Sequence, residues 1–397
     1  GVKITFIEDS SEMGGVQHST LLLAEYLWLT GQYDIETLLP NSGPFADKLS
    51  QKSIPIIFYK PISYKSTSKS FFNDRIRIPN PIAWAWNLSA ILLNIIRIKK
   101  NIKSTTDLVI TKGLINHFAS GLACERLNIP VICHLQDLIT NRYFGLMNII
   151  FNIFAKIIPN YIICDGQSIQ NQLNNSVLPK TKVILNGINV SDLKRSDVLR
   201  NQIRNEFGIS KDAYVIGHVG RMTPWKGQEA LLNAFIDYSS INENAYLFLV
   251  GTPLFDNDLY YNSIIKILES HSLMHRVIMP GYRNDLQSLF SAMDLFLYPS
   301  LEKDTSPLAL ISAISSGLAV GMSTIDSLSE IADKCNYIDI FNPKKLDEMS
   351  ALMKKYENDE IRKKIGLLNR EAGKNNFDIS IHGQKFQRII EQNRKGI

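Results

Sequence analysis

The chain has 397 residues, of which 45% are hydrophobic and 20% are charged, and its formal net charge at pH 7 is +5. A chain longer than about 250–300 residues usually divides into two domains, because a single hydrophobic core stops growing near that size. The mild charge does not indicate a nucleic-acid-binding protein, and the four cysteines form no CxxC pair, which is typical of buried free thiols in a reducing compartment.

The chain begins with an apolar segment, residues 3–9 (KITFIED), which predicts a strand. This segment lacks the basic stretch and the long apolar run of a signal peptide. Residues 14–31 have apolar residues at helical spacing and end in a glycine, so they predict a helix. No stretch reaches about 18 uncharged apolar residues, so no transmembrane helix is expected, and the protein is expected in the cytoplasm.

Short apolar segments alternate with helical segments along the rest of the chain. The predicted strands are DIETLLP (34–40), PIIFYK (55–60), DLVITKG (107–113), PVICHLQD (130–137), YIICDGQS (161–168), YVIGHVGR (214–221), AYLFLVGTP (245–253), RVIMPGYR (276–283), LFLYPS (295–300) and LAVGMS (318–323). This alternation predicts parallel sheets covered by helices on both faces, in two Rossmann-like α/β domains. The polar stretch 186–202 is predicted to contain the boundary between the domains, which gives domains at 1–195 and 196–378. A last helix in 379–397 is predicted to pack back on the first domain.

The middle of the first half carries three unusual segments. Residues 60–80 are basic, serine-rich and without a clear period, which predicts a long loop that is either mobile or functional. Residues 81–104 are apolar, contain Trp84 and Trp86 and end in a Lys/Arg-rich stretch, and residues 143–162 are also unusually apolar. Each apolar segment fits either a helix that covers the sheet or a helix that lies at a membrane interface.

Two cations stand where the strand at 214–221 is followed by a helix. Arg221 and Lys226 are five positions apart, with Pro224 and Trp225 between them. In an open α/β sheet, ligands bind beyond the carboxyl ends of the strands, and helix N-termini there offer amide groups and a partial positive charge. Arginine donates two hydrogen bonds to phosphate oxygens and lysine adds a compact charge. The pair indicates a diphosphate site, and the alternative is a solvated pair of cations at a helix start.

Two further stretches have the composition of ligand-binding turns. Gly14 and Gly15 lie between the first strand and the first helix, where glycines let the backbone approach a ligand closely; an ordinary turn is the alternative. After the strand that ends at residue 300, Asp304 has a carboxylate to offer a ligand and Pro307 is suited to open a helix. The amide groups of residues 305–309 would then bind an anion, and the alternative is a capped helix without a ligand.

Taken together, these stretches resemble the family 4 retaining glycosyltransferases, which have the GT-B fold and are also called glycosyl transferase group 1. The resemblance is carried, in order, by the N-terminal GG, VILNGI (183–188), GRMTPWKG (220–227), VGTP (250–253), residues 277–300 and PSLEKDTSPLALISAISSGLAV (299–320). It covers nearly the whole chain and is strongest in the second half. It implies two Rossmann-like, doubly wound parallel-sheet domains that face a cleft.

The resemblance also implies a function. A hexosyltransferase of this kind moves a sugar from a nucleotide-diphospho-sugar, here a UDP- or dTDP-sugar, to a glycan or lipid-linked acceptor in surface polysaccharide synthesis, with retention at the anomeric carbon. It would work in the cytoplasm, with peripheral contact at the inner membrane face. No cofactor and no metal are expected, because cations and helix dipoles stabilise the leaving diphosphate.

Two other functions fit parts of the same sequence. The first is a catalytically silent relative that binds a sugar nucleotide or supports a partner enzyme. The second is a nicotinamide-dependent oxidoreductase, which the absence of GxGxxG after any predicted strand disfavours. A metal site is also disfavoured: Asp256-Asn257-Asp258 imitates a DxD motif but fits a solvated loop, and His271 and His275 lack the HExxH pattern.

By resemblance, Arg221 and Lys226 bind the diphosphate and stabilise it as it leaves, while Asp304, His134 and Gln136 act near the sugar. The other implied donor-binding residues are Gly14, Gly15, Gly220, Tyr282, Thr305, Ser306, Pro307, Leu308 and Ser312.

The sequence departs from the family at three of these positions. The family has two glutamates eight positions apart, where this chain has Asp304 and Ser312. A serine cannot accept hydrogen bonds from two ribose hydroxyls as a glutamate does, so a deoxyribose donor such as a dTDP-sugar would lose less. The family's His-Asp pair corresponds to Gln136-Asp137, with His134 two residues earlier on the same face of the strand. His134 is therefore either a cleft residue or a buried histidine.

Overall fold

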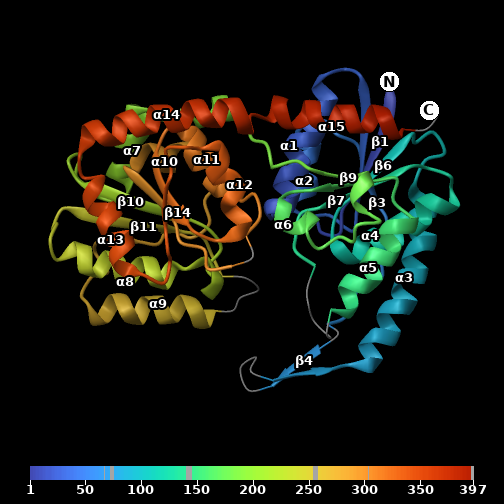
Figure 1. The fold of residues 1–397 in the computed structure, drawn as a ribbon, viewed down its shortest axis with the longest axis horizontal. Helices are drawn as coiled ribbons and strands as arrows, with labels where there is room; N and C mark the ends of the chain where they lie inside the picture. Colours follow the sequence, from blue (N-terminus) through green and yellow to red (C-terminus); the bar gives the residue numbers. More distant parts are fainter. Residues whose placement is uncertain (67, 72–75, 140–144, 254–257, 303, 395–397) are drawn as a thin grey trace. The chain divides into compact units, whose positions relative to one another are not determined.

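The computed structural model describes residues 1–66, 68–71, 76–139, 145–253, 258–302 and 304–394. The chain divides into two compact units, one formed by residues 1–185 with 382–397 and the other by residues 186–381. Each unit contains one parallel sheet with helices on both of its faces (Figure 1). This is the predicted α/β architecture with two Rossmann-like sheets.

The units divide at residues 185/186 and 381/382, where the sequence had suggested 195/196 and 378/379. The difference follows from hydrogen bonds that the sequence does not display. The Asn186 amide donates to the Ser306 hydroxyl at 2.7 Å, and the Arg195 guanidinium donates to the carbonyl of Phe290 at 2.9 Å, so residues 186–195 are attached to the second unit. The His382 ring lies 2.7 Å from the carbonyl of Leu185, within the first unit.

The first unit has a seven-stranded sheet in the order β3-β2-β1-β6-β7-β8-β9, and all neighbouring strands are parallel. Its strands are β1 Val2–Ile7, β2 Tyr33–Leu39, β3 Ile56–Phe58, β6 Leu108–Thr111, β7 Val131–Leu135, β8 Tyr161–Cys164 and β9 Thr181–Val183. Its helices are α1 Gly15–Leu29, α2 Pro44–Gln51, α3 Pro81–Asn101, α4 Leu114–Arg126, α5 Leu146–Ile157, α6 Gln167–Gln170, the short 3₁₀ helix η1 Leu178–Lys180 and α15 Ile379–Asn393, which joins this unit from His382.

Two cores fill the space between this sheet and its helices, because successive strand side chains point to opposite faces. In β6, Leu108 and Ile110 pack with α1, α2 and α15, whereas Val109 packs with α3 and α4. Phe386 and Ile390 of α15 are fully buried in the first of these cores. A third cluster joins α4, α5 and α6 to the far end of the sheet.

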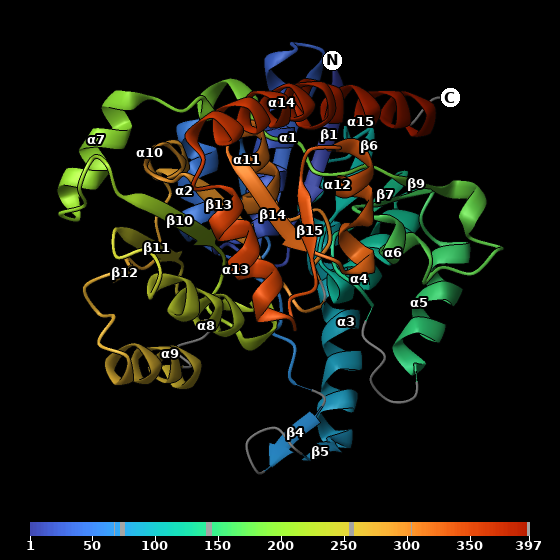
Figure 2. The same ribbon diagram turned by 60° about the vertical axis from the view of Figure 1, so that its left-hand side comes forward.

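Part of the segment predicted as a loop forms an antiparallel hairpin, β4 Ser68–Phe71 paired with β5 Ile76–Pro79. The prediction of a loop across residues 60–80 was therefore wrong for these residues. Only the segment IRIP alternates apolar and polar residues, and three of the four residues of SKSF are polar, so the strand signal is too weak to stand out in a serine-rich stretch. The hairpin lies at the N-terminal end of α3, and both extend from the rest of this unit (Figures 1 and 2).

Helix α3 is long and apolar enough to cross a membrane by length and composition alone, and 33% of its 18-residue window is buried. Helix α5 is a shorter apolar helix. Both helices bury one side against this unit and expose large apolar side chains on the other. The exposed apolar side chains are Ile82, Trp86, Leu88, Leu92, Leu93 and Ile96 on α3, and Leu146, Ile149, Ile150, Ile153 and Ile157 on α5.

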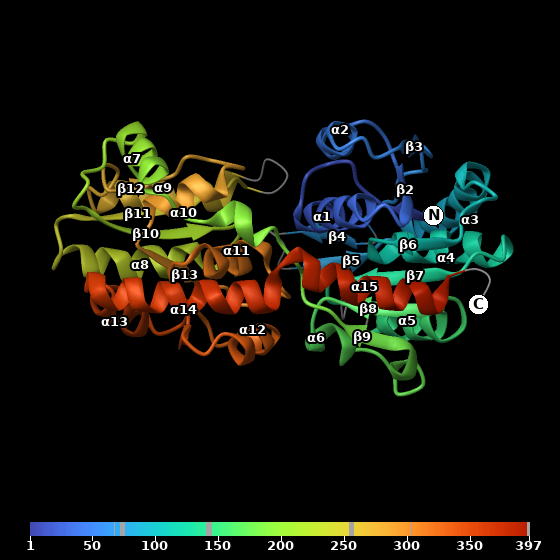
Figure 3. The same cartoon turned by 90° about the horizontal axis from the view of Figure 1, so that it is seen from above.

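The second unit has a six-stranded parallel sheet in the order β12-β11-β10-β13-β14-β15. Its strands are β10 Tyr214–Val219, β11 Ala245–Val250, β12 Val277–Ile278, β13 Leu295–Tyr298, β14 Ala319–Ser323 and β15 Asp339–Phe341. Its helices are α7 Asp197–Glu206, α8 Gln228–Ser239, α9 Asp258–Ser270, α10 Leu286–Ala292, α11 Leu308–Ser316, α12 Ser329–Lys334, α13 Leu346–Lys355 and α14 Asp359–Phe377, with short 3₁₀ helices η2 Val190–Leu193, η3 Pro224–Lys226 and η4 Asp326–Leu328. One face of the sheet packs on α8, α9 and α13, and α14 lies beside α11 (Figure 3).

Candidate active site

The order of strands in the second unit brings two of the predicted stretches together. Strand β13 pairs with β10, so the segments that follow these two strands leave the same edge of the sheet side by side. The first segment holds Arg221 and Lys226, and the second holds Asp304. The turns are also joined directly, because the amide of Leu301 donates to the carbonyl of Trp225 at 2.8 Å.

Lys226, Asp304 and Tyr298 form a buried polar cluster at this edge. The Lys226 Nζ lies 2.6 Å from Asp304 Oδ1 and 2.6 Å from the Tyr298 hydroxyl, and that hydroxyl lies 3.0 Å from Asp304 Oδ2. The ammonium group also stands 4.4 Å from the centre of the Trp225 ring, at the distance of a cation–π contact. The predicted phosphate-binding cation and the predicted sugar-facing carboxylate are therefore ion-paired in this structure.

Burial changes the pKa values of the groups in and next to this cluster. It lowers the pKa of Lys226 below its usual value, while the Asp304 carboxylate opposes that shift. Burial also raises the pKa of Tyr298 well above its usual value, so its hydroxyl stays protonated and able to donate. Directly beneath, burial lowers the pKa of His218 to about 3, which leaves a neutral ring that contacts the carbonyl of Leu297 at 3.0 Å.

Gly227 explains how the turn reaches this position. It caps η3 and starts α8 with φ of +77°, and a Cβ at this position would lie 2.0 Å from the carbonyl oxygen of Pro299. Only glycine fits both the left-handed conformation and this close approach. The close approach holds the N-terminus of α8 against the end of β13, and so places Lys226 beside Tyr298.

The loop from Asp304 to Leu308 ends at the N-terminus of α11, as predicted from Pro307. Ser306 adopts φ of +46°, an uncommon conformation for a residue other than glycine, and its hydroxyl and carbonyl accept hydrogen bonds from Asn186. The first amide groups of α11 have no partner within the helix and are available to an anion. Thr305, Pro307 and Leu308 are partly exposed, whereas Ser312 lies one turn into α11 and is buried.

The other predicted residues of this unit lie at the same edge of the sheet. Arg221 is exposed, and the described part of the structure shows no side-chain hydrogen bond or ion pair for it. The backbone of Gly220 passes so close to Gly251 that a Cβ there would lie 1.9 Å from the Gly220 oxygen. Tyr282 follows β12 and is 63% exposed. The exposed Arg221 is thus the cation more accessible to an incoming anion.

In the first unit, the glycine pair opens α1. Gly14 is the N-cap residue, and its amide donates to the side-chain oxygen of Gln17 at 3.2 Å. Gly15 is exposed, with no atom within 4 Å of where its Cβ would lie, so the space around its backbone is open.

The two strand residues predicted near the sugar have different surroundings. Gln136 follows β7 and is partly exposed. His134 is fully buried: its ring lies 2.6 Å from Asp165 and 5.1 Å from the ring of Phe386, and burial holds its pKa well below the usual value. His134 is therefore the buried histidine of the two alternatives, with a neutral ring, and it does not reach the surface. The ring of Phe386 on α15, distant in sequence, packs against it.

Several residues of these sites were not predicted. Tyr298 bridges Lys226 and Asp304, and in the first unit Glu8, Lys112 and Asp165 are buried charged residues at the carboxyl ends of strands. A signal for the last three exists in the sequence, since each directly follows a short apolar strand. Tyr298 carries no such signal, because it reads as the last apolar residue of its strand.

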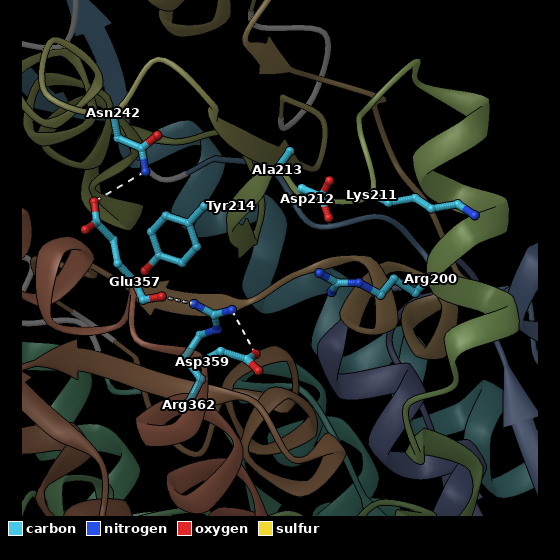
Figure 4. A pocket seen from close by; sticks show the side chains of 9 residues that line it. All are labelled: Arg200, Lys211, Asp212, Ala213, Tyr214, Asn242, Glu357, Asp359 and Arg362. Carbon is cyan, nitrogen blue, oxygen red and sulfur yellow. Dashed lines mark hydrogen bonds and ion pairs between the residues drawn. The ribbon is translucent and has the colours of Figure 1, made fainter.

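A separate cavity of about 430 Å³ lies at the opposite edge of the sheet in the second unit. Its lining residues, shown in Figure 4, are Arg200, Lys211, Asp212, Ala213, Tyr214, Asn242, Glu357, Asp359 and Arg362. Tyr214 begins β10, so this cavity faces the amino ends of the strands. No predicted site residue lines it. Parallel sheets bind ligands at the carboxyl edge, so the cluster around Lys226 is the better candidate for the donor site.

Within the described residues, no group of three or more His, Cys, Asp or Glu side chains is arranged to hold a metal ion. Asp256 and Asn257 of the DxD-like motif lie outside the described residues.

Comparison with known proteins shows that the chain is similar to glycosyltransferases. Residues 200–375 match the family model for glycosyl transferases group 1. A UDP-Gal:alpha-D-GlcNAc-diphosphoundecaprenol alpha-1,3-galactosyltransferase of Escherichia coli is 24% identical over 82% of this chain and 80% of its own length. The O-antigen biosynthesis glycosyltransferase WclY of Escherichia coli is 25% identical over 44% of this chain and 47% of its own length.

Among solved structures, Anabaena Alr3699/HepE in complex with UDP and glucose superimposes with a TM-score of 0.81. It is 20% identical and covers 98% of this chain and 100% of its own. At this identity the likeness concerns the fold, which is GT-B.

Proposed function

We propose that this chain, a GT-B glycosyltransferase whose residues 200–375 match glycosyl transferases group 1, transfers a hexose from a UDP- or dTDP-sugar to a glycan or lipid-linked acceptor in surface polysaccharide synthesis. The observation that carries this proposal is the carboxyl edge of the second sheet, where Arg221, Lys226 and the start of α11 converge within the region that matches the family. Two cations and a helix N-terminus together suit a diphosphate.

The proposed reaction keeps the configuration of the anomeric carbon and needs no metal. An acceptor hydroxyl oxygen forms a bond to the anomeric carbon while the bond from that carbon to the diphosphate breaks. The diphosphate leaves with the bonding electrons, and the acceptor proton passes to it. Arg221 and Lys226 stabilise the charge that develops on the leaving group, and Asp304, Gln136 and the backbone at Gly15 contact the sugar.

The base and sugar of the donor are part of the proposal. Two observations point in different directions: the neighbouring structure is described with UDP, whereas Ser312 is too short to accept hydrogen bonds from two ribose hydroxyls as a glutamate would. We take UDP-sugars as the first candidates. The comparison of UDP with dTDP then tests whether Ser312 has relaxed the requirement for a 2′-hydroxyl.

A thermal-shift panel followed by turnover assays tests this function. A nucleotide at 100 times its dissociation constant stabilises the folded state by about 2.7 kcal/mol, so UDP, dTDP and their sugars should raise the unfolding temperature while NADH and GDP should not. An active enzyme also hydrolyses the bound donor slowly without acceptor. Donor binding with no turnover under any acceptor would instead indicate a silent relative, and a panel without any stabilising nucleotide would refute the proposal.

We also propose that the protein contacts the cytoplasmic membrane surface through α3 and α5. These helices expose apolar side chains, and neither contains an acidic residue, whereas Arg97, Lys99, Lys100 and Lys156 are basic. An apolar face with basic residues is typical of a helix that binds anionic lipid. A lipid-linked acceptor would reach the enzyme at such a surface. Flotation with lipid vesicles tests this contact.

A further inference from the structure

A row of polar residues crosses the carboxyl edge of the first unit's sheet. Glu8, Lys112, Gln136 and Asp165 are each the first residue after a strand, namely β1, β6, β7 and β8. These four strands are consecutive neighbours in the sheet. Strands of a parallel sheet end at the same edge, so the four side chains stand next to one another in that order.

Hydrogen bonds join three members of this polar row, namely Lys112, Gln136 and Asp165. The Lys112 ammonium donates to the side-chain oxygen of Gln136 at 2.8 Å, and the side-chain nitrogen of Gln136 donates to Asp165 Oδ2 at 3.0 Å. These two contacts define the orientation of the Gln136 amide, with its oxygen toward β6 and its nitrogen toward β8. The other oxygen of Asp165 meets the His134 ring at 2.6 Å.

The row also reaches the glycine turn at the start of α1. One oxygen of Glu8 accepts a hydrogen bond from the Gln17 side chain at 3.2 Å, and the other accepts from Thr20. The Gln17 oxygen in turn accepts from the Gly14 amide. Hydrogen bonds therefore connect the Gly14–Gly15 turn to Glu8, and Glu8 attracts Lys112, which is bonded to Gln136. The turn and Gln136 are the two parts of this unit that are proposed to contact the sugar.

Its charged members are buried, which is unusual for ionisable groups. Glu8 and Lys112 are 0% exposed and Asp165 is 1% exposed, while Gln136 is the partly exposed member of the row. Burial raises the pKa of Glu8 to about 7 and lowers the pKa of Lys112 to about 8, and each charge counteracts the shift of the other. A buried ammonium between two carboxylates carries a large desolvation cost. Such groups are found where they orient a functional side chain.

We propose that Lys112 is a positioning residue for glycosyl transfer: together with Glu8 and Asp165 it holds the amide of Gln136 in one orientation toward the sugar. Lys112 does not itself touch the substrate, because its side chain is buried. This inference rests on the proposed function, since it assigns Gln136 to the transfer step.

A double-mutant cycle tests this role. Lys112→Met removes the donor and the charge while keeping an unbranched side chain that is one atom shorter. We expect kcat to fall about 10–100-fold, the scale seen when the hydrogen-bond partner behind a functional group is removed, with the KM for the donor unchanged. In a Gln136→Ala background the same substitution should lower kcat less than about twofold, because two residues that act through one group are not additive.

A matched control separates this role from a loss of packing. Thr106→Val removes a buried hydrogen bond of the same unit, the 3.1 Å contact between the hydroxyls of Thr106 and Thr5, away from the carboxyl edge. It should lower the unfolding temperature without changing kcat. If Lys112→Met does not fold, Asp165→Asn removes a charge from the same row and enters the same cycle.

The outcomes distinguish the inference from the function. A wild-type protein without turnover on any nucleotide sugar would refute the proposed function and this inference with it. An active wild type, with Gln136→Ala impaired and Lys112→Met equal to wild type, would overturn only the positioning role. Losses of kcat that multiply in the double variant would also overturn it, since Lys112 would then act independently of Gln136.

Discussion

The contact between Lys226 and Asp304 changes the roles that can be expected for both residues. The sequence assigned the first to the diphosphate and the second to the sugar, but here the two side chains form an ion pair that is nearly closed to solvent, at 11% and 7% side-chain exposure. The diphosphate of a donor would compete with Asp304 for the ammonium group. Arg221 has no such competitor among the described residues, so it is the cation that an incoming donor meets first.

Substitution of the two cations tests their roles. Arg221→Ala and Lys226→Ala should each reduce transition-state stabilisation by about 2–4 kcal/mol, the scale for removing one preorganised charge-stabilising donor. They should differ in stability, because Arg221 is exposed whereas loss of Lys226 leaves the Asp304 carboxylate buried without its counter-charge. Measurements of kcat/KM and of the unfolding temperature on each variant separate the two effects.

The cavity of Figure 4 supplies the control for this experiment. Lys211→Ala removes a cation at the opposite edge of the same sheet, and its kcat/KM should equal that of wild type. Unchanged turnover in both Arg221→Ala and Lys226→Ala would show that the diphosphate binds elsewhere. The double variant Lys226→Met with Asp304→Asn removes both charges together, so its stability should exceed that of Lys226→Ala.

At the scale of elements, α3 and α5 differ from the other helices of their unit in what they leave uncovered. Leu88, Leu92 and Ile96 follow one another at helical spacing on α3, and Ile149, Ile153 and Ile157 do so on α5, all exposed. Residues four apart lie on one face of a helix. Each helix thus has a buried face that packs in the unit and a second, exposed apolar stripe. The sequence showed that both were apolar but not that a second stripe stays uncovered.

Removing part of these stripes should weaken membrane binding. The double variant Leu92→Asn with Ile153→Asn changes two side chains that are 59% and 58% exposed. Burying a Leu or Ile side chain stabilises by about 1.5 kcal/mol or more, so binding to vesicles of zwitterionic and anionic lipid should fall on the order of 100-fold. Flotation measures the bound fraction.

An exposed leucine in the second unit gives the comparison for this variant. Leu367→Asn alters a side chain of α14 that is 69% exposed, and its flotation should match that of wild type. Failure of the wild-type protein to float with anionic vesicles would refute the proposal that these helices contact a membrane. Equal loss of binding in the double variant and in Leu367→Asn would point to a general effect of surface hydrophobicity.

Across the whole molecule, buried histidines make stability depend on pH. Burial lowers the pKa of His117, His218 and His382 to about 3 and that of His134 well below its usual value. In the unfolded chain each would titrate near 6.5. Below pH 6.5 the unfolded state therefore binds protons that the folded state does not bind, and the stability of the folded state falls as the pH falls.

Two carboxyl groups, those of Glu8 and Asp9, oppose this trend. The pKa of Glu8 is raised from 4.5 to about 7, so the folded state binds one proton more than the unfolded state between those values, and this group adds stability as the pH falls through 7. Burial also raises the pKa of Asp9, which acts in the same direction. The four histidines outnumber the two carboxyl groups, so unfolding still takes up protons near pH 5. Each proton contributes about 1.4 kcal/mol per pH unit, so the histidines decide the direction.

The unfolding temperature should therefore decrease steadily from pH 7 to pH 5, as measured by scanning calorimetry. His218→Gln removes one of the four groups, and its unfolding temperature should depend less steeply on pH over this interval. An unfolding temperature that is constant or rises toward pH 5 would contradict the assignment of these histidines as neutral in the folded protein.

The sequence by itself was enough to predict two parallel α/β sheets and to locate Arg221, Lys226, Gly14, Gly15 and the start of α11. These predictions rest on local signals: alternating strands and helices, glycines in turns, and cations where a strand meets a helix. Local signals are sufficient to place residues at the carboxyl edge of a parallel sheet, because that edge is defined by strand direction alone. The positions of these residues along the chain were therefore sufficient.

Only the tertiary structure decided which side chains meet. The pairing of Lys226 with Asp304 and Tyr298 joins residues more than 70 positions apart, and the row from Glu8 to Asp165 depends on the order of strands β1, β6, β7 and β8. The burial of His134 depends on α15, from the other end of the chain. Contacts of this kind depend on the order of the strands in a sheet and on helices from distant parts of the chain that pack against it. A sequence pattern within one segment carries no information about strand order or about such distant helices.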